Sequence, residues 1–388
     1  MINREQFKAE VQKNLQENIL QFWQEKMIDP AGGFYGQMDV DQKIEANAPK
    51  GAILNARILW TFSAAYKALK KEEYLQTATR CYEYFVKHFI DTEYGGVYWS
   101  LNADGTPLDT KKQFYAHGFA IYGLSEYYGI TKKQEALDYA ISIFETIEKR
   151  SYNQVGGYIE ATQRNWEPIT NMKLSNKDAN EPFSMNTHLH ILEPYTNLYR
   201  VWKSEQLKNR LLDLIDIFCE KIYDKQNHHL GLFFNLKWEN TEHAFSYGHD
   251  IEASWLLLEA AMELEDESIT NKVKPISYKI AMAALEGWQS DGSLIYEWHH
   301  KKGHDTERHW WVQAETVVGL LWLYDYHGYE KGYEMATKCW EYIKEHLIDT
   351  ENGEWWWSRM PDGTINSAQD KAGFWKCPYH NGRMCLMV

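Results

Sequence analysis

Apolar side chains recur three and four residues apart through long stretches of the chain. Residues 54–66 carry Leu, Ile, Leu, Phe, Ala and Tyr at positions 54, 58, 59, 62, 65 and 66, and residues 317–324 show the same spacing. Such a period, close to the ~3.6 residues of a helical turn, is typical of a helix that buries one face. The pattern therefore predicts a chain built mostly from helices.

Glycine turns divide these helical stretches at regular intervals. Residues 89–106 resemble residues 347–364 without a gap, at an offset of 258. Turns followed by short strand-like runs lie at Gly32, Gly95, Gly156, Gly231, Gly292 and Gly353, which are 63, 61, 75, 61 and 61 residues apart. Each interval has room for two ordinary helices and a short hairpin. The sequence thus predicts six repeated units, each with a pair of helices.

Six such units can form an open array or close into a ring. An open solenoid needs polar repeats at its ends, whereas the first and last units here are as aromatic as the middle ones. We therefore expect an all-α fold, an (α/α)6 barrel of six helix pairs with short β-hairpins in the loops on one face. An open helical array is the alternative. Residues 1–388 are expected to form one domain, with the short strands shaping a cleft.

Composition narrows the function classes. Asp and Glu exceed Lys and Arg by 55 to 41, a formal charge of −14, which argues against binding to a nucleic-acid backbone. The apolar runs are far shorter than the ~18 residues of a membrane span, and the N-terminal stretch has no signal-peptide core. Five scattered cysteines form no zinc or disulfide pattern. These features predict a cytoplasmic protein without nucleic-acid or membrane partners.

One polar stripe within a helical pattern consists of Asn186, His190 and Glu193, separated by four and three residues. His188 lies on a different helix face, so His188 and His190 cannot form a two-ligand metal clamp on a regular helix. His190 is a candidate for proton transfer. A buried histidine hydrogen-bonded to Glu193 or Asn186 is an equally good interpretation of the spacing.

A second stripe pairs His249 with Glu252 at i, i+3 spacing. A carboxylate at this spacing would fix the imidazole tautomer and raise its basicity, as in a general acid/base site. A buried ion pair explains the spacing equally well.

Arg57 lies within an otherwise apolar helix pattern, so its guanidinium must either reach the surface or meet an anion. Trp311 and Glu315 are four residues apart, a spacing best explained by a wide apolar stripe with one acid. Residues 373–383 are dense in aromatic, basic and histidine residues, which indicates that the C-terminal stretch has a function.

Two histidine pairs, His228–His229 and His299–His300, lie in loop-like segments beside Asn, Lys and Gly. We interpret them as solvated. The sequence also contains no phosphate-binding loop, dinucleotide fingerprint, zinc-protease motif or nucleophile elbow. Neither nucleotide hydrolysis nor a serine nucleophile is therefore indicated.

Five segments occur together in a distinctive order: Ala56–Trp60, Met185–His190, Gly248–Glu252, Trp310–Glu315 and Lys376–Arg383. In this combination the chain resembles the cellobiose 2-epimerases of the N-acylglucosamine 2-epimerase superfamily, from about residue 20 to its end. The resemblance implies an (α/α)6 barrel that reversibly epimerises C2 of the reducing-end glucose of a β-1,4-linked disaccharide, without metal or nucleotide cofactor. The Pro-Tyr-His-Asn-Gly-Arg run at residues 378–383 favours a disaccharide over an N-acylglucosamine.

The resemblance also implies roles for individual residues. It points to His249 and His380 as the acid/base pair at C2, to His190 as the acid/base group in ring opening, and to Arg57 as a cation that binds oxygen. The residues implied to line the sugar site are Tyr115, Asn186, Glu252, Trp310 or Trp311, Glu315 and Trp375.

A two-base site suits this chemistry because inversion at C2 requires the proton to leave one face of an enediolate and return on the other. One imidazole must then be neutral while its partner is protonated. Ring opening must come first, since the C2 proton becomes acidic only beside a carbonyl. A fixed cation such as Arg57 would stabilise the enediolate.

Other functions share parts of this pattern. An N-acylglucosamine 2-epimerase or a mannose aldose-ketose isomerase would use the same histidines. An inverting glycoside hydrolase can use an α/α barrel with two carboxylates, and a non-catalytic sugar-binding protein would need only the aromatic residues. We expect a monomeric epimerase whose partner is its small-molecule disaccharide.

Overall fold

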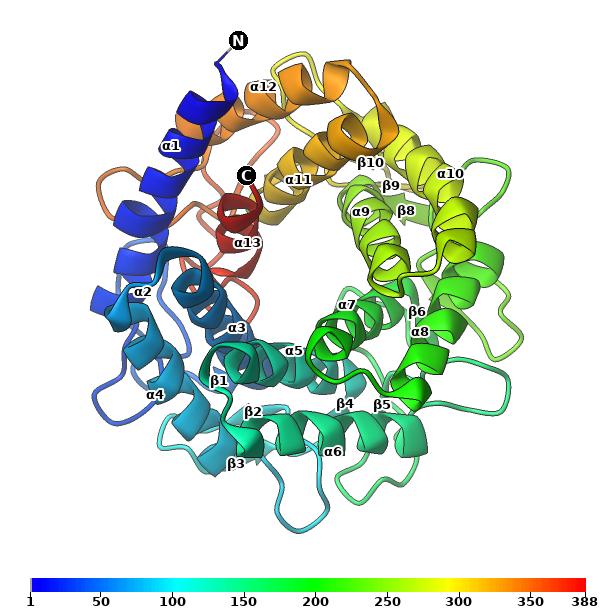
Figure 1. Cartoon of the computed structure of the whole chain (residues 1–388). Coiled ribbons are helices and arrows are strands. Elements are labelled where there is room, and N and C mark those ends of the chain that lie inside the picture. The colour runs from blue at the N-terminus through cyan, green and yellow to red at the C-terminus, as the bar shows by residue number, and fades with distance from the viewer. Residues whose placement is uncertain (1) are drawn as a thin grey trace.

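The computed structural model describes residues 2–388 and forms a closed ring of helices (Figure 1). The chain alternates between an outer and an inner helix as it runs once around this ring. The inner helices are α3 (Ala52–Leu69), α5 (Phe114–Thr131), α7 (Met185–Val201), α9 (Tyr247–Glu263), α11 (Trp310–His327) and α13 (Tyr379–Met387). The outer segments are α1 (Arg4–Asn14) with η1 (Leu15–Leu20) and α2 (Gln21–Glu25), α4 (Glu72–His88), α6 (Gln134–Arg150), α8 (Glu205–Ile217) with η2 (Phe218–Ile222), α10 (Glu267–Ala284) with η3 (Leu285–Gly287), and α12 (Lys331–His346).

The ring closes where the two ends of the chain meet. Helix α13 packs against both α3 and α11, and the N-terminal outer segment covers α13 from outside. That segment also contacts the last repeat, since Trp23 Nε1 donates to Glu354 Oε2 at 2.7 Å and Trp340 Nε1 donates to Glu10 Oε2 at 3.0 Å. The expected (α/α)6 barrel is therefore confirmed, and the open array is excluded.

The hydrophobic pattern explains which helices lie inside. Helices α5 and α11 are buried around most of their circumference because each packs against an outer helix and against inner neighbours on both sides. An outer helix such as α4 buries one stripe, which includes Ala78 and Phe85, and exposes its charged side. Among residues 2–388, no helix combines the length and the apolar character needed to cross a membrane.

Short antiparallel strands lead into the inner helices at one end of the barrel. The strands are β1 (Lys50–Gly51), β2 (Ser100–Leu101), β3 (Pro107–Asp109), β4 (Lys112–Gln113), β5 (Ala161–Thr162), β6 (Phe183–Ser184), β7 (Phe233–Phe234), β8 (Ala244–Ser246), β9 (Glu297–His299), β10 (Gly303–Asp305), β11 (Arg308–His309) and β12 (Ser358–Arg359). They pair as β1-β2-β3, β8-β9-β10, β4-β5, β6-β7 and β11-β12. Five of them end immediately before an inner helix, so the strand-bearing loops surround the N-terminal ends of the inner helices.

A tight turn closed by a bridge follows each outer segment. Five of the six predicted turn glycines have a positive φ, a backbone conformation in which a side chain is strained. The fourth turn differs, because His228 takes the positive φ (68°) and Gly231 does not. The prediction that Gly231 forms this turn is therefore wrong. His228 tolerates the conformation because a polar residue is strained less there than a β-branched one.

The fourth residue of four inner helices is a polar residue that accepts a hydrogen bond from the preceding turn. The bonds are Val97 N to His117 Nε2 at 3.1 Å, Tyr158 N to His188 Nε2 at 3.0 Å, Leu230 N to Asp250 Oδ1 at 3.0 Å, and Leu294 N to Gln313 Oε1 at 2.8 Å. His188 thus fastens a turn to its helix and points away from the side used by His190. The expected separation of these two histidines is confirmed.

His229 is buried rather than solvated. Its Nδ1 lies 2.7 Å from Asp250 Oδ2, and its ring stacks on Phe245. The solvated interpretation of the His228–His229 pair is therefore wrong for His229, because its acidic partner lies 21 residues further along the chain. His300 is exposed, as expected.

Buried lysines reinforce three of the turns. Their Nζ atoms contact the acidic residue of the turn in the pairs Lys50–Asp29 at 2.5 Å, Lys112–Asp91 at 2.7 Å and Lys371–Asp349 at 2.6 Å. Both side chains of the Lys371–Asp349 pair are almost completely buried. A carboxylate in such a place is stable only with its counter-charge.

We expect the His188→Gln variant to resist acid better than the wild-type protein. Burial lowers the pKa of His188 to about 4, below the ~6.5 of an unfolded histidine. Between these values the unfolded chain binds the proton first, so the folded state loses stability as pH falls, by about 1.4 kcal/mol per pH unit for one group. Glutamine keeps the acceptor, as Gln313 does, but does not take up a proton.

The measurement is the free energy of unfolding in urea between pH 6.5 and 4. The His188→Gln slope should be shallower than that of wild type, whereas the exposed-site control His300→Gln should keep the wild-type slope. Equal slopes for His188→Gln and wild type would contradict the assigned role.

We expect Lys371→Met to destabilise the protein by about 3–5 kcal/mol, because it leaves the Asp349 carboxylate buried without its partner. The matched control is Lys225→Met, which removes an exposed pair with Glu220 and should change stability by about 0.5 kcal/mol or less. Urea unfolding at neutral pH measures both. Similar small losses in the two variants would refute the importance of the buried pair.

Candidate active site

A cavity of about 310 Å³ opens at the N-terminal end of the inner helices. Ten of the predicted site residues line it, namely Arg57, Tyr115, Asn186, His190, His249, Glu252, Trp310, Trp311, Trp375 and His380. With the exception of Trp375, they lie on inner helices, mostly within the first two turns. The ring therefore brings together side chains from all six repeats.

Three cavity histidines are anchored in the same way. Nδ1 of His190 lies 3.1 Å from Glu193 Oε2, Nδ1 of His249 lies 3.0 Å from Ser246 Oγ, and Nδ1 of His380 lies 2.7 Å from Glu315 Oε1. Within residues 2–388, Nε2 of each ring has no hydrogen-bond partner. Each imidazole therefore presents one nitrogen for exchange with a ligand while the other fixes its orientation.

All three imidazoles are held neutral. Burial lowers the pKa of His249 to about 3. Burial also lowers the pKa of His190, against the opposing effect of Glu193. For His380, burial and the nearby Arg57 and Arg383 guanidinium groups lower the pKa well below its ordinary value. A neutral imidazole can accept a proton. The expectation that one of His249 and His380 is protonated is not met in the free protein, where both are neutral.

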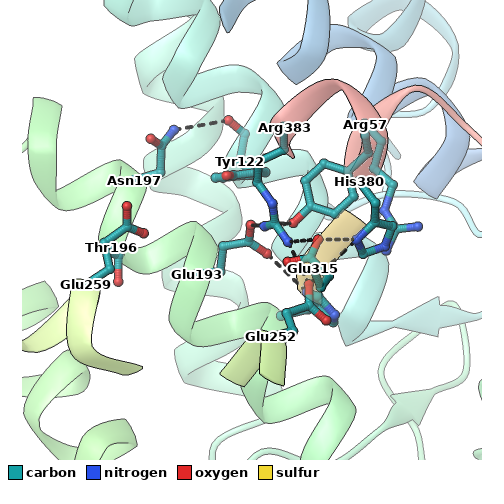
Figure 2. Close-up of polar contacts among 12 residues, drawn as sticks. Arg57, Tyr122, Glu193, Thr196, Asn197, Glu252, Glu259, Glu315, His380 and Arg383 are labelled. Carbon is teal, nitrogen blue, oxygen red and sulfur yellow. Dashed lines mark hydrogen bonds and ion pairs between the residues drawn. The ribbon is translucent and has the colours of Figure 1, made fainter. Parts of the chain in front are cut away.

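Arg383 on α13 connects the carboxylates behind the cavity (Figure 2). Its Nη2 donates to Glu252 Oε1 at 2.7 Å and to Glu315 Oε1 at 2.6 Å, and its Nη1 donates to Glu193. All four side chains are at most 1% exposed. One guanidinium thus holds three buried carboxylates from three different helices.

This arrangement corrects three expectations. Glu252 does not hydrogen-bond to His249, because the carboxylate turns toward Arg383 and Ser246 anchors that histidine instead. Glu315 does not line the cavity but lies behind His380, where it also accepts from Trp255 Nε1 at 3.2 Å. Glu315 is also more than a single acid in an apolar stripe, because it forms an ion pair with Arg383 and contacts His380.

Arg57 is buried, 3% exposed, and presents its charge to the cavity. Its Nη2 donates to the Tyr115 hydroxyl at 2.8 Å, and its guanidinium lies over the rings of Phe119 and Tyr379 at 4.1 and 4.8 Å from their centroids. Within residues 2–388 it forms no salt bridge. Arg57 therefore does not reach the surface, and an anionic group of a ligand fits its unpaired charge.

The carboxylates differ in protonation. Burial opposes ionisation of Glu193, but Arg383 and His190 outweigh it and lower the pKa of this carboxyl to about 2. Burial and the neighbouring Glu315 raise the pKa of Glu252 well above its ordinary value. The centre therefore combines a firmly ionised acid with one that resists ionisation.

Glu252, Glu315 and His380 each place one potential metal-ligating atom within 4.8 Å of the others. The donor set does not fit a metal ion, because Arg383 Nη2 already contacts the inner oxygens of both carboxylates and His380 Nδ1 contacts one of them. A second positive charge there would be repelled by the guanidinium.

Sequence reasoning missed several residues of the site. Arg383 and Glu193 belonged to noted motifs, but their convergence is visible only in three dimensions. The loop between β5 and β6 supplies Leu174, Ser175, Lys177 and Asp178, other loops supply Tyr296, Trp357 and Gln369, and β11 supplies His309. These residues follow no helical spacing, so no periodic pattern along the chain predicts them.

Comparisons with known proteins identify the family of this chain. The family model of N-acylglucosamine 2-epimerase (GlcNAc 2-epimerase) matches residues 33–382. The chain is 55% identical over 382 residues to a cellobiose 2-epimerase of Bacteroides fragilis, covering 98% of this chain and 97% of that protein.

Solved structures give the same result. The cellobiose 2-epimerase of Bacillus thermoamylovorans is 43% identical and superposes with a TM-score of 0.94 over 99% of this chain and 98% of that one. A D-mannose isomerase, only 21% identical, shares the fold with a TM-score of 0.84 over 99% of this chain and 97% of that one. From the family match and the full-length identity, this chain belongs to the N-acylglucosamine 2-epimerase family.

Proposed function

We propose that the protein interconverts the reducing-end glucose and mannose of β-1,4-linked disaccharides, with cellobiose and 4-O-β-glucosyl-mannose as the pair. It is then an isomerase, a cellobiose 2-epimerase. The observation that carries the chemistry is that His249 and His380, 131 positions apart in the chain, line one cavity and both pack against Trp311. The full-length likeness to cellobiose 2-epimerases supports the substrate.

Ring opening is the first step of the proposed reaction. It moves a proton between the anomeric hydroxyl and the ring oxygen, and we assign this transfer to Nε2 of His190. Arg383 keeps the Glu193 carboxylate ionised. This negative charge, in contact with Nδ1 of His190, stabilises the imidazole when it takes up the proton. Burial keeps His190 neutral at the outset.

Epimerisation follows at C2 of the open-chain sugar. One of His249 and His380 removes the proton, which leaves an enediolate, and the other returns a proton on the opposite face. Arg57, unpaired and permanently charged, stabilises the developing negative charge on oxygen. The exposed Nε2 atoms of both imidazoles are suited to this exchange.

The remaining cavity residues hold the sugar in this proposal. The faces of Trp310, Trp311 and Trp375 suit the apolar C–H faces of sugar rings, and Tyr115 and Asn186 suit hydroxyls. Asn186 Oδ1 is buried without a partner in the described chain, residues 2–388, which favours a ligand hydroxyl there. Glu315, placed behind His380, is reassigned from binding sugar to orienting that imidazole.

The enzyme is also proposed to be cytoplasmic and monomeric. The five cysteines are free and buried, which suits a reducing compartment.

Separate incubations with cellobiose, N-acetylmannosamine and mannose should give turnover with cellobiose and formation of 4-O-β-glucosyl-mannose. Turnover of N-acetylmannosamine alone would reject the proposed substrate. Release of free glucose from cellobiose would instead identify a glycoside hydrolase. Sugar analysis by chromatography distinguishes these products.

In heavy water, deuterium should enter C2 of the product. His249→Ala and His380→Ala should each reduce epimerisation by about 10²–10⁴-fold, because each removes one of the two proton-transfer groups. His300→Ala, a change on the exposed surface, is the control and should retain wild-type activity. Nuclear magnetic resonance of the product measures both label and turnover. Full activity in both cavity variants is incompatible with the assignment.

A further inference from the structure

The buried centre behind the cavity has more negative than positive side chains. Glu193, Glu252 and Glu315 all contact the single guanidinium of Arg383. Three ionised carboxylates around one cation would leave uncompensated negative charge in a region that water does not reach. A buried group in this position takes up a proton instead.

Two of the three acids compete for the same donor. Oε1 of Glu252 and Oε1 of Glu315 both accept from Arg383 Nη2, and ligating atoms of the two residues lie within 4.8 Å of each other. Two carboxylates this close in a dry interior hold one proton between them, as in paired catalytic acids. Glu193 has its own partners in Arg383 Nη1, the Tyr379 hydroxyl and His190.

Hydrogen-bond partners decide which acid is neutral. Glu315 accepts from Arg383 and Trp255 and contacts His380 Nδ1, so its charge is well supported. Glu252 has one donor, and its Oε2 is buried without any partner within residues 2–388. These contacts favour the proton on Glu252 in the free enzyme.

We propose that Glu252 and Glu315 form a proton-sharing pair that recharges His380 during catalysis. The inference rests on the proposed function, because it concerns the reprotonation of C2. Glu252 and Glu315 are positioning residues in this scheme, since they act through the imidazole rather than on the reacting carbon.

The need for such a pair follows from His380 itself. Its imidazole is neutral in the resting enzyme, and a neutral imidazole is a poor acid. As the Nε2–H bond breaks and the C2–H bond forms, Nδ1 takes a proton from the carboxyl pair across the 2.7 Å contact with Glu315. The enediolate loses its negative charge, and the pair becomes doubly ionised beside Arg383.

The same contact serves His380 as a base. When Glu315 is ionised, Nδ1–H donates to it and Nε2 is free to remove a proton from C2. When the proton moves from Glu252 to Glu315, Nδ1 becomes the acceptor and Nε2 carries the hydrogen. Glu252 Oε1 lies 3.8 Å from His380 Nδ1, so both acids are close to the nitrogen that receives the proton.

Other charged or titratable groups near the pair lie on the inner helices. They are Arg57 on α3, Tyr115 on α5, His190 and Glu193 on α7, His249 on α9, and Tyr379, His380 and Arg383 on α13. Tyr115 and Tyr379 stay neutral in the working pH range because burial raises the pKa of each hydroxyl.

Infrared difference spectroscopy tests where the proton resides. The wild-type protein at neutral pH should show a carbonyl band of a protonated carboxylic acid that is missing in Glu252→Gln. Glu10→Gln, a change at a partly exposed residue paired with Lys344, should retain the band. If Glu252→Gln does not fold, Glu315→Gln tests the same point, because Glu252 then ionises beside Arg383 and the band disappears.

Isotope exchange tests the role in catalysis. One of the two epimers loses its C2 proton to His249, and this step does not involve the carboxyl pair. In heavy water, Glu252→Gln should therefore still exchange the C2 proton of that epimer for deuterium. Its exchange rate should stay within about tenfold of wild type, whereas epimerisation should fall by about 100-fold or more. In the wild type, kcat should fall at alkaline pH as the pair loses its proton. The residual activity of Glu252→Gln should not show this fall.

Two results would overturn the inference: an unchanged carboxylic acid band in folded Glu252→Gln, or parallel loss of exchange and epimerisation in that folded variant. The infrared result does not depend on turnover. If the wild-type protein fails to epimerise cellobiose, the proposed function is rejected. The infrared result still decides where the proton lies.

Discussion

Closure of the helical ring is the constraint on which the rest of the structure depends. The inner helices are apolar around most of their circumference and gain stability only when both sides and the outer face are covered. Closure aligns their N-terminal ends around one cavity, so six distant stretches of chain contribute side chains to it. The polar turn-to-helix bonds at His117, His188, Asp250 and Gln313 then fix four of the six turns to their inner helices.

The rigid frame makes a costly polar centre possible. Arg383 and its three carboxylates lose their hydration, and only the complete set of mutual contacts offsets that loss. The result is an electrostatic environment that is set before substrate arrives. Imidazoles stay neutral because of burial and nearby cations, and Arg57 keeps an unpaired charge at the cavity wall. Preorganised charge of this kind requires little rearrangement during reaction.

The sequence predicted the parts that depend on local periodicity. The glycine repeat and the apolar spacing were enough for six helix pairs. The ten predicted residues that line the cavity came from the family resemblance of the five motifs. It did not predict what depends on distant partners. Glu252 turns to Arg383, 131 residues away, rather than to its helix neighbour His249, and His229 finds a buried acid on the next inner helix. Helical spacing predicts which residues are neighbours on the same helix. The buried ion pairs of this core instead join residues from different segments of the chain.

Helix α13 carries both His380 and Arg383, and it is covered from outside by the segment at the opposite end of the chain. As the polypeptide emerges from the ribosome, five inner helices and most of the cavity wall precede the guanidinium that neutralises their acids. Until α13 is in place, the three carboxylates therefore lack the cation that they share, and the cavity lacks His380.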